Sequence, residues 1–435
     1  MVVKPVKVGI CGMGTVGGGT FDVLTRNAEE IARRAGRRIE ISAVAMRRPN
    51  PAIDTTGVHV TADVFEIATN PEIDIVIELI GGYDTARDLV MTAIQNGKHV
   101  VTANKALIAV HGNEIFAAAQ EKNVMVAFEA SVAGGIPVIK AIREGLAANK
   151  IDWLAGIING TGNFILTEMR EKGRDFADVL AEAQALGYAE ADPTFDVEGI
   201  DAAHKLTILA SIAYGIPLQF DKAYTEGISK ITAEDVNYAE ELGFRIKHLG
   251  ITRRTETGIE LRVHPTLIPE NALLANVNGV MNAVLVDGDA VGQTLYYGPG
   301  AGALPTASAV VADVVDVVRT LTADRDNRVP HLAFQPAELS DARILPVEEV
   351  NSAYYLRLQV AERPGVLAHI ARILGDKGIN IEAIIQKQVD DDQVPVILLT
   401  QRVLESTMNE ALREIAALPD TVGEITRIRV EQLAD

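Results

Sequence analysis

The chain has 435 residues, enough for two or three domains, and 48% of them are hydrophobic. Its net charge of −19 argues against nucleic acids and anionic membranes as partners, because both repel an acidic surface. No apolar run is long enough to span a bilayer, and the single cysteine, Cys11, allows neither an intrachain disulfide nor a multi-cysteine metal site, so we expect a cytoplasmic protein.

The stretch "VKVGICGMGTVGGGTFDVL" predicts a strand, a glycine-rich turn and a helix. Its glycines follow the spacing G-x-G-x-x-G, in which they permit a tight turn, close approach of a pyrophosphate, and packing of helix on strand. The pyrophosphate would lie at the helix N-terminus, where backbone N–H groups point at it. We therefore predict a dinucleotide site at the turn, made by Gly12, Met13, Gly14, Thr15, Val16 and Gly17.

The next strand, "RRIEISAVAM", ends without the acidic residue that usually holds the ribose hydroxyls of NAD. It runs instead into Arg47 and Arg48, whose charges suit a 2′-phosphate. This pattern favours NADP(H), with NAD(H) as the second cofactor. The alternative is that both arginines are simply solvated in a loop.

Residues 73–82 predict a strand, residues 83–97 a helix, and "KHVVTANK" a further strand. The last strand places Thr102, Asn104 and Lys105 at the carboxyl edge of the sheet, where open α/β sheets bind ligands. A lysine at a helix N-terminus opposes the helix dipole, so Lys105 fits a site with an anionic partner better than an ordinary first turn.

Residues 124–146 predict a strand, a glycine-rich turn and a helix that opens at Pro137. Glu129 supplies a carboxylate there, and the irregular turn exposes backbone carbonyls. Oxygen ligands of this kind suit a hard cation. From the residues alone, a purely structural turn is the stronger interpretation.

The stretch "ADPTFDVEGIDAAHK" gathers acids around one lysine, Lys205. One interpretation is a solvated helix start, since Asp201 and Lys205 have the spacing of an exposed helical ion pair. However, "IDAAHKLTILASIAYGI" is apolar on nearly every face, which is typical of a buried helix. Buried charges are rare unless they are paired, so the pattern favours a functional site.

Beyond this helix the pattern changes to longer strands, at 260–268, 277–288 and 293–302, of which the last two are joined by a hairpin turn. They predict an α+β domain with a mixed sheet. Gly298, Gly300 and Gly302 then precede a long apolar helix at 303–325, and indicate either a second cofactor contact or a conformational requirement of the turn.

Residues 324–350 lack periodicity and predict a linker. From residue 351 onward the order strand, helix, strand, strand, helix, strand predicts a ferredoxin-like domain. Because it contains no nucleophile–base set, we expect it to serve regulation or assembly.

The motif from Ala183 to Lys205 resembles the signature of homoserine dehydrogenases, as do "VTANKAL", "FEASVAGGIP", "NGTGNFIL" and "YYGPGAG". Residues 361–384 resemble an ACT domain. The resemblance implies a Rossmann-type NAD(P)-binding domain at 1–135, completed by about 303–323. It also implies a catalytic and dimerisation domain at 136–323 and an ACT regulatory domain at 351–435.

The family reduces L-aspartate 4-semialdehyde to L-homoserine, on the route to threonine, methionine and isoleucine. By resemblance, Lys205 is the proton donor and Lys105 a second site lysine. The substrate is held by Gly187, Glu190, Asp196 and Asp201. Cofactor contacts come from the turn at 12–17, Arg47, Arg48, Thr102, Lys105 and Gly302. A sodium ion is held by the Glu129 side chain and the carbonyls of Val132, Gly134 and Ile136.

The ACT resemblance implies an amino-acid effector site at Arg363, Gly365, Val366, Leu367 and Asn380. We expect L-threonine as the effector and a homodimer or homotetramer as the assembly; a domain kept only for assembly is the alternative. We also expect that truncation after about Asp324 leaves a catalytically competent core.

Two other functions are alternatives to this one. A dehydrogenase that forms an acyl-enzyme thioester needs a nucleophilic cysteine. Cys11, in the cofactor turn, does not suit that role. A non-catalytic nucleotide and amino-acid sensor would be expected to have lost Lys105 or Lys205, and both are present.

Overall fold

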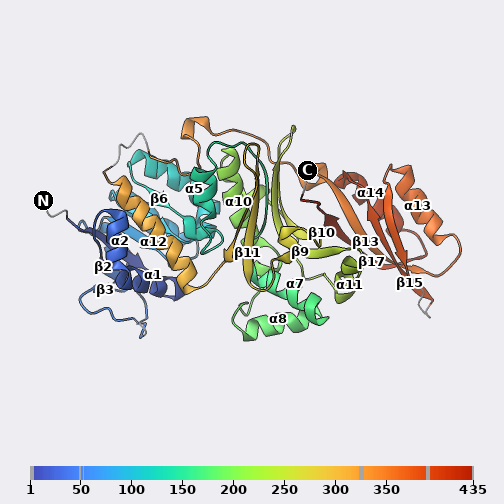
Figure 1. Cartoon of the computed structure of the whole chain (residues 1–435), viewed down its shortest axis with the longest axis horizontal. Coiled ribbons are helices and arrows are strands. Elements are labelled where there is room, and N and C mark those ends of the chain that lie inside the picture. The colour runs from blue at the N-terminus through green and yellow to red at the C-terminus, as the bar shows by residue number, and fades with distance from the viewer. Residues whose placement is uncertain (1–3, 49, 52, 323–327, 388–391, 434–435) are drawn as a thin grey trace. The chain divides into compact units, whose positions relative to one another are not determined.

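The computed structural model describes residues 4–48, 50, 51, 53–322, 328–387 and 392–433 (Figure 1). The chain forms two compact units, each assembled from three separate stretches. Unit 1 contains Met1–Leu154, Asp201–Ala223 and Val280–Ala342; unit 2 contains Ala155–Ile200, Tyr224–Gly279 and Arg343–Asp435.

The first sheet of unit 1 is parallel and has six strands in the order β3-β2-β1-β4-β5-β6. This is the strand order of a dinucleotide-binding Rossmann domain, as predicted. Its central strands are apolar on both faces because helices cover both sides. The strands are β1 (Val6–Cys11), β2 (Ile39–Ala45), β3 (His59–Thr61), β4 (Ile75–Glu78), β5 (His99–Thr102) and β6 (Val126–Ala127).

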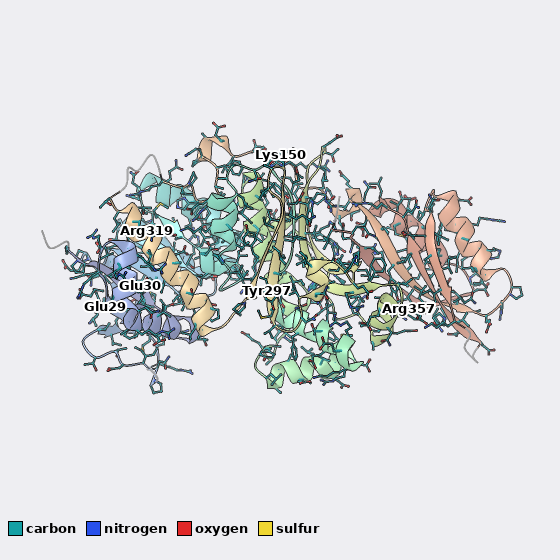
Figure 2. All side chains as sticks on the ribbon, in the orientation of Figure 1. Glu29, Glu30, Lys150, Tyr297, Arg319 and Arg357 are labelled. Carbon is teal, nitrogen blue, oxygen red and sulfur yellow. The ribbon has the colours of Figure 1, made fainter. Side chains whose placement is uncertain are left out.

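Five helices follow the strands of this sheet along the chain, and a sixth comes from far along the sequence. The five are α1 (Thr15–Arg26), α2 (Ala28–Ala35), α3 (Val64–Thr69), α4 (Asp84–Gln95) and α5 (Lys105–Glu121). The sixth, α12 (Ala303–Thr320), packs along α1 so tightly that a Cβ on Gly19 would lie 2.6 Å from the Ala303 carbonyl oxygen (Figure 1). Near its other end, the Arg319 guanidinium, labelled in Figure 2, donates to the carbonyl of Arg34 at 3.0 Å.

The rest of unit 1 includes the buried helix α10 (Ile200–Tyr214), whose residues belong to unit 1 from Asp201 onward. The predicted hairpin is present as β11 (Met281–Gly288) and β12 (Gly292–Pro299), and the sheet order here is β12-β11-β7. β7 (Ile151–Ile157) continues into unit 2. Short elements complete the unit: η1 (Glu129–Ser131), α6 (Val138–Lys140), η2 (Ala141–Gly145), η3 (Phe220–Lys222) and η6 (Pro336–Glu338).

Unit 2 combines helices with a sheet in the order β9-β10-β17-β13-β15-β14. Its first two strands form a long antiparallel pair, β9 (Phe244–Arg254) and β10 (Ile259–Pro269), and β8 (Tyr224–Thr225) pairs with β10. The helical elements are α7 (Gly160–Lys172), α8 (Phe176–Ala185), α9 (Thr194–Val197), α11 (Ala233–Glu241), η4 (Leu273–Asn276) and η7 (Val347–Glu349).

The C-terminal part of unit 2 has the predicted ferredoxin-like order of elements. They are β13 (Asn351–Ala361), α13 (Val366–Asp376), β14 (Ile381–Gln386), β15 (Gln393–Thr400), β16 (Val403–Leu404), α14 (Glu405–Ala416) and β17 (Thr421–Val430). β17 also pairs in parallel with β10, at Thr266 with Arg429 and Leu267 with Val430. The C-terminal strands therefore extend the sheet of the preceding domain.

Residues 328–350, the described part of the expected linker, divide between the two units. Four of its apolar side chains are buried: Leu332, Ile344, Leu345 and Val350. Among the described residues, no helix combines the length and apolar character needed to cross a bilayer.

Candidate functional site

A cavity of about 1020 Å³ opens beside the glycine turn between β1 and α1. Gly12 has a φ of +97°, and a Cβ there would lie 2.5 Å from the Leu79 carbonyl oxygen. A Cβ on Gly17 would lie 1.9 Å from the Gly12 carbonyl oxygen. Gly14 caps α1 without a side chain, and even a Cβ there would meet no atom within 4 Å, so the helix N-terminus is open to an anion. These features fit a bound dinucleotide.

The same cavity is lined by residues from both ends of the expected cofactor site: Gly12, Met13 and Gly14 from the turn, and Arg47 and Arg48 after β2. β2 ends at Ala45, and both arginine side chains are exposed. Leu79, Ile80 and Gly81, which follow β4, line it as well. Both arginines therefore line the same cavity as the glycine turn.

Two lysines and one buried aspartate form a partly buried cluster in unit 1. The Asp201 carboxylate lies between the two ammonium groups, with Oδ1 3.0 Å from Lys105 Nζ and Oδ2 2.7 Å from Lys205 Nζ. Asp201 is in the first turn of α10, and Lys205 is one turn later. Lys105 is the first residue of α5, whose N-terminus is capped by the Asn104 side chain. Residues that are 96 positions apart in the sequence thus meet at one carboxylate.

His204, which the sequence interpretation missed, lies next to this cluster. Its Nε2 is 3.5 Å from the Tyr83 hydroxyl, and its ring packs on Phe220 with centroids 4.2 Å apart. Burial lowers the pKa of His204 to about 4, so the imidazole is neutral at neutral pH and adds no charge to the cluster. A histidine within an apolar helix, next to Lys205, was the signal available in the sequence.

The remaining substrate residues expected from the signature lie in unit 2. Asp196, in α9, accepts a hydrogen bond from Asn159 Nδ2 at 2.8 Å. Glu190 has an exposed side chain, and its carbonyl accepts from Gln184 Nε2 at 3.0 Å. Gly187 follows α8 with a φ of +75°, a left-handed conformation that favours glycine. Asp201 and Lys205 lie in unit 1, so the signature stretch contributes to both units.

The expected cation turn lies in unit 1 and contains two consecutive residues with positive φ, Ala133 at 55° and Gly134 at 50°. The Glu129 carboxylate accepts hydrogen bonds from the N–H groups of Ile139 and Lys140, at 2.9 and 2.8 Å. Burial raises the pKa of Glu129 to about 7.

A second buried acid, Asp313 of α12, accepts from the Glu129 N–H at 2.7 Å. Burial and the neighbouring charge of Glu129 raise the pKa of Asp313 well above its ordinary value. Two buried carboxylates beside an irregular turn fit a bound cation, which would offset their charge. No three His, Cys, Asp or Glu side chains in the described part of the chain are grouped to hold a metal. The cation ligands implied by the resemblance are one carboxylate and several backbone carbonyls, so they do not require three such side chains.

The glycine-rich segment after β12 packs directly on this turn. The Gly135 N–H donates to the Pro299 carbonyl at 3.1 Å, and a Cβ on Gly134 would lie 2.4 Å from the Gly300 carbonyl oxygen. Gly302, with a φ of +117°, then caps α12 without a side chain. The expected cation turn therefore packs directly against the segment that holds the expected second cofactor contact.

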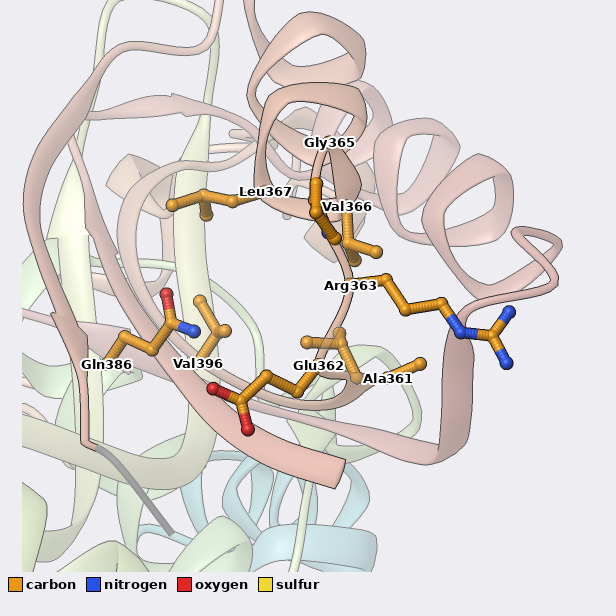
Figure 3. A pocket seen from close by; sticks show the side chains of 10 residues that line it. Ala361, Glu362, Arg363, Gly365, Val366, Leu367, Gln386 and Val396 are labelled. Carbon is orange, nitrogen blue, oxygen red and sulfur yellow. The ribbon is translucent and has the colours of Figure 1, made fainter. Parts of the chain in front are cut away.

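A separate pocket of about 320 Å³ lies in the ACT-like part of unit 2 (Figure 3). Four of the five expected effector residues line it: Arg363, Gly365, Val366 and Leu367. The polar groups of Glu362 and Gln386 lie at the pocket, whereas the Arg363 side chain extends away from them, with its guanidinium 3.5 Å from Asp420 (Figure 3). Asn380 is not among the lining residues; its Nδ2 donates to Gln401 Oε1.

Known proteins match nearly the whole chain. Residues 12–129 match the NAD-binding domain of homoserine dehydrogenase, residues 137–315 match homoserine dehydrogenase, and residues 354–417 match the ACT domain. The chain is 73% identical to a homoserine dehydrogenase of Pseudomonas aeruginosa, over 99% of this chain and 100% of the relative.

Two solved structures are informative. The fold is similar to that of a homoserine dehydrogenase from Thiobacillus denitrificans, with a TM-score of 0.95, 66% identity and 99% of each chain covered. It is also similar to a hyperthermophilic archaeal homoserine dehydrogenase in complex with NADPH, with a TM-score of 0.63 and 26% identity, over 74% of this chain and 99% of that one. With its NAD-binding sheet, its lysine–aspartate cluster and its ACT domain, the chain belongs to the homoserine dehydrogenase family.

Proposed function

We propose that this oxidoreductase reduces L-aspartate 4-semialdehyde to L-homoserine with NADPH, and that Lys205 donates the proton. The observation that carries the proposal is the Asp201 carboxylate held between the ammonium groups of Lys105 and Lys205. Two ammonium groups and one carboxylate leave a net positive charge in a largely buried place. Such a charge stabilises an alkoxide that develops on a reduced aldehyde.

We propose the following roles for the residues of this site. Bound NADPH would supply the hydride. Lys205 Nζ donates a proton to the substrate oxygen as that oxygen gains charge, and Asp201 holds the ammonium in place. Lys105 keeps a second positive charge near the same oxygen. Glu190 and Asp196 are acids that suit the α-ammonium of an amino-acid substrate, as their positions in the signature imply.

NADPH rather than NADH is the proposed cofactor. Arg47 and Arg48 line the dinucleotide cavity after a strand that ends without an acid, and the archaeal relative was solved with NADPH. A monovalent cation, sodium, is proposed at the Glu129 side chain and the carbonyls of Val132, Gly134 and Ile136. Its support is the pair of buried acids, Glu129 and Asp313, whose pKa values burial raises.

L-Threonine is the proposed effector, bound at the pocket of the ACT-like part, and the proposed assembly is a homodimer or homotetramer. The pocket offers a carboxylate, Glu362, for an α-ammonium group, and it is of a size suited to a free amino acid. Effector control requires that threonine bind the active and inactive arrangements with different affinities.

The decisive experiment follows loss of NADPH absorbance with aspartate semialdehyde as substrate. We expect turnover with this aldehyde and much weaker turnover with an aldehyde that lacks the α-amino group. A folded protein that binds NADPH but does not turn over aspartate semialdehyde would show that the proposed reaction is wrong. In that case the non-catalytic sensor is the better description.

A further inference from the structure

Glu78, the last residue of β4, is a fully buried carboxylate at a place where the strand is otherwise apolar. Its Oε1 accepts hydrogen bonds from the N–H groups of Ile80 and Gly81, at 2.8 and 3.1 Å. Its Oε2 accepts from the Thr102 hydroxyl at 2.6 Å. One side chain therefore joins the loop after β4 to the end of β5.

The first of these connections leads to the cofactor. Leu79, Ile80 and Gly81 line the dinucleotide cavity. The glycine turn rests on the same loop, because a Cβ on Gly12 would lie 2.7 Å from the Leu79 carbonyl carbon and 2.9 Å from Ile80 N. A shift of this loop would therefore displace the surface on which the cofactor turn packs.

The second connection leads to Lys105. The Thr102 hydroxyl also accepts the Asn104 N–H at 2.9 Å. Asn104 Oδ1 caps α5 by accepting the Leu107 N–H at 3.1 Å, and its Nδ2 donates to the Gly82 carbonyl at 2.7 Å. Asn104 is thus held from both sides, and the next residue is Lys105.

A buried carboxylate at this position is costly unless donors compensate it. The pKa of Glu78 is raised by burial, while the hydrogen bonds from Thr102, Gly81, Ile80 and Asn104 act in the opposite direction. The core of the sheet does not need this charge, since Ile75, Val76 and Ile77 before it are all apolar and buried. The two connections instead require a side chain with two acceptor oxygens, one for the loop after β4 and one for Thr102.

We propose that Glu78 is a positioning residue that fixes the site lysine Lys105 relative to the cofactor loop. It touches no reacting atom. It acts through Thr102 and Asn104 on one side and through the backbone of Ile80 and Gly81 on the other. The inference rests on the proposed role of Lys105 in the reaction.

The test perturbs the connection to Thr102, and leaves the connection to the cofactor loop in place, with Glu78→Gln and Thr102→Val. Glutamine keeps an oxygen for Ile80 and Gly81 but places an N–H donor where Thr102 donates, and valine removes the hydroxyl. Each variant should lower kcat about tenfold, because small displacements of a positioned group slow chemistry strongly. The KM for NADPH should change less than about twofold in Glu78→Gln, because the bonds to the cofactor loop remain.

Three further measurements complete the design. The double variant should be no slower than either single variant, since both break the same connection. The deuterium isotope effect on kcat with deuterated NADPH should rise, which a loss of stability alone would not cause. Glu72→Gln is the matched control, because Glu72 is an exposed glutamate of the same domain, paired with Lys7; its kinetics should equal the wild type.

The inference is wrong if Glu78→Gln and Thr102→Val keep kcat within twofold of the wild type, or if their losses multiply in the double variant. It is also wrong if the variants lose only thermal stability. The premise, that Lys105 takes part in the reaction, is tested separately with Lys105→Ala. Full turnover in that variant would remove the proposed role of the lysine, whatever Glu78→Gln shows.

Discussion

Asp201 lies between two ammonium groups, and the effect of removing either one depends on how buried the charges are. Its side chain is 7% exposed and that of Lys205 is 12% exposed, whereas that of Lys105 is 37% exposed. Breaking a buried pair by removing one partner is strongly destabilising, because the other charge is left without compensation. Replacing Lys205 should therefore affect both the chemistry and the local charge balance, while replacing Lys105 should affect mainly the chemistry.

We expect Lys205→Ala to lower kcat by about 10²–10⁴-fold, the usual contribution of a positioned general acid. Lys105→Ala should also lower kcat by at least about tenfold, through loss of charge near the reacting oxygen. NADPH binding, followed by fluorescence titration, should stay close to that of the wild type. Lys222→Ala, an exposed lysine of the same unit, is the control. Near-wild-type turnover in either site variant would remove its assigned role.

Lys247 is a buried lysine whose pKa burial lowers to about 7. Its Nζ donates to the Val277 carbonyl at 2.6 Å and to the side-chain oxygens of Asn163 and Asn278 at 3.3 Å. Below pH 7 the lysine is protonated in both the folded and unfolded states, so the cost of burying its charge is fully present. Above pH 7 the folded lysine loses its proton while the unfolded one keeps it. The contribution of Lys247 to the unfolding free energy must therefore rise with pH.

We therefore compare the wild type with Lys247→Met in urea unfolding at pH 7 and pH 9. Between pH 7 and pH 9, the unfolding free energy of the wild type minus that of Lys247→Met should increase by up to about 1.4 kcal/mol per pH unit. Lys122→Met, at an exposed position, should give a difference that does not depend on pH in this way. A flat difference for Lys247→Met would contradict the lowered pKa.

At the scale of elements, the cofactor prediction concerns the loop after β2. Replacing Arg47 and Arg48 together by alanine should raise the KM for NADPH roughly tenfold or more, the effect of losing charge-assisted hydrogen bonds. The KM for NADH should change little. Arg26→Ala, an exposed arginine at the end of α1, is the control. Equal losses for both cofactors would show that these arginines do not bind the 2′-phosphate.

Elements encoded by local patterns were predictable from the sequence. The strand, glycine turn and helix at 6–26 and the buried helix at 200–214 are present as expected, because short-range periodicity and glycine spacing specify them. The pairing of Asp201 with Lys205 followed from helical spacing. The ferredoxin-like order also followed from the alternation of strands and helices.

Contacts between distant segments were not predictable in this way. Asp313 bonds to Glu129 across 184 positions, and Glu78 bonds to Thr102 across 24. No local pattern encodes which strand ends meet, although an acid at the end of an apolar strand, as in "IVIELIGG", indicates that a partner must exist. The packing of the C-terminal strands on the preceding domain was missed for the same reason.

At the scale of the whole molecule, this packing changes the expected result of truncation. Tyr355 and Ile397 of the ACT-like part share a core with Ile165 and Leu267. Arg357, labelled in Figure 2, reaches α11, where its Nε donates to Asp235 at 2.6 Å. The C-terminal part is therefore packed against α7, α11 and β10 and is not merely tethered to them.

Buried charges cross the same boundary. Arg262 of β10, which is 1% exposed, has Glu431, beyond β17, as an ion-pair partner at 2.5 Å. Truncation after about Asp324 would remove that partner, leave Arg262 paired with Glu260 alone at 2.9 Å, and expose the core that the C-terminal part shares with Ile165 and Leu267. We now expect the truncated chain to melt well below the full chain or to precipitate, as thermal denaturation would show. A soluble fragment with the melting temperature of the full chain would contradict this.

Threonine control is better tested with the C-terminal part left in place. Glu362→Gln should raise the threonine concentration for half-inhibition by about tenfold, because it removes the charge proposed to bind the α-ammonium group. Glu382→Gln, at an exposed position on β14, is the matched control. If the wild type ignores millimolar threonine in both reaction directions and calorimetry detects no binding, the domain serves assembly alone.

The packing of α12 on α1 also determines when the dinucleotide-binding domain can finish folding during synthesis. Its last strand, β6, ends at Ala127, but α12 begins only at Ala303. At about 5–20 residues per second, that helix leaves the ribosome roughly 10–35 seconds after the strand. Throughout this interval the apolar face of α1 that α12 will cover, including Gly19, faces solvent or a chaperone. A nascent chain stalled before Ala303 should therefore be protease-sensitive in α1, and one stalled well beyond Thr320 should be protected.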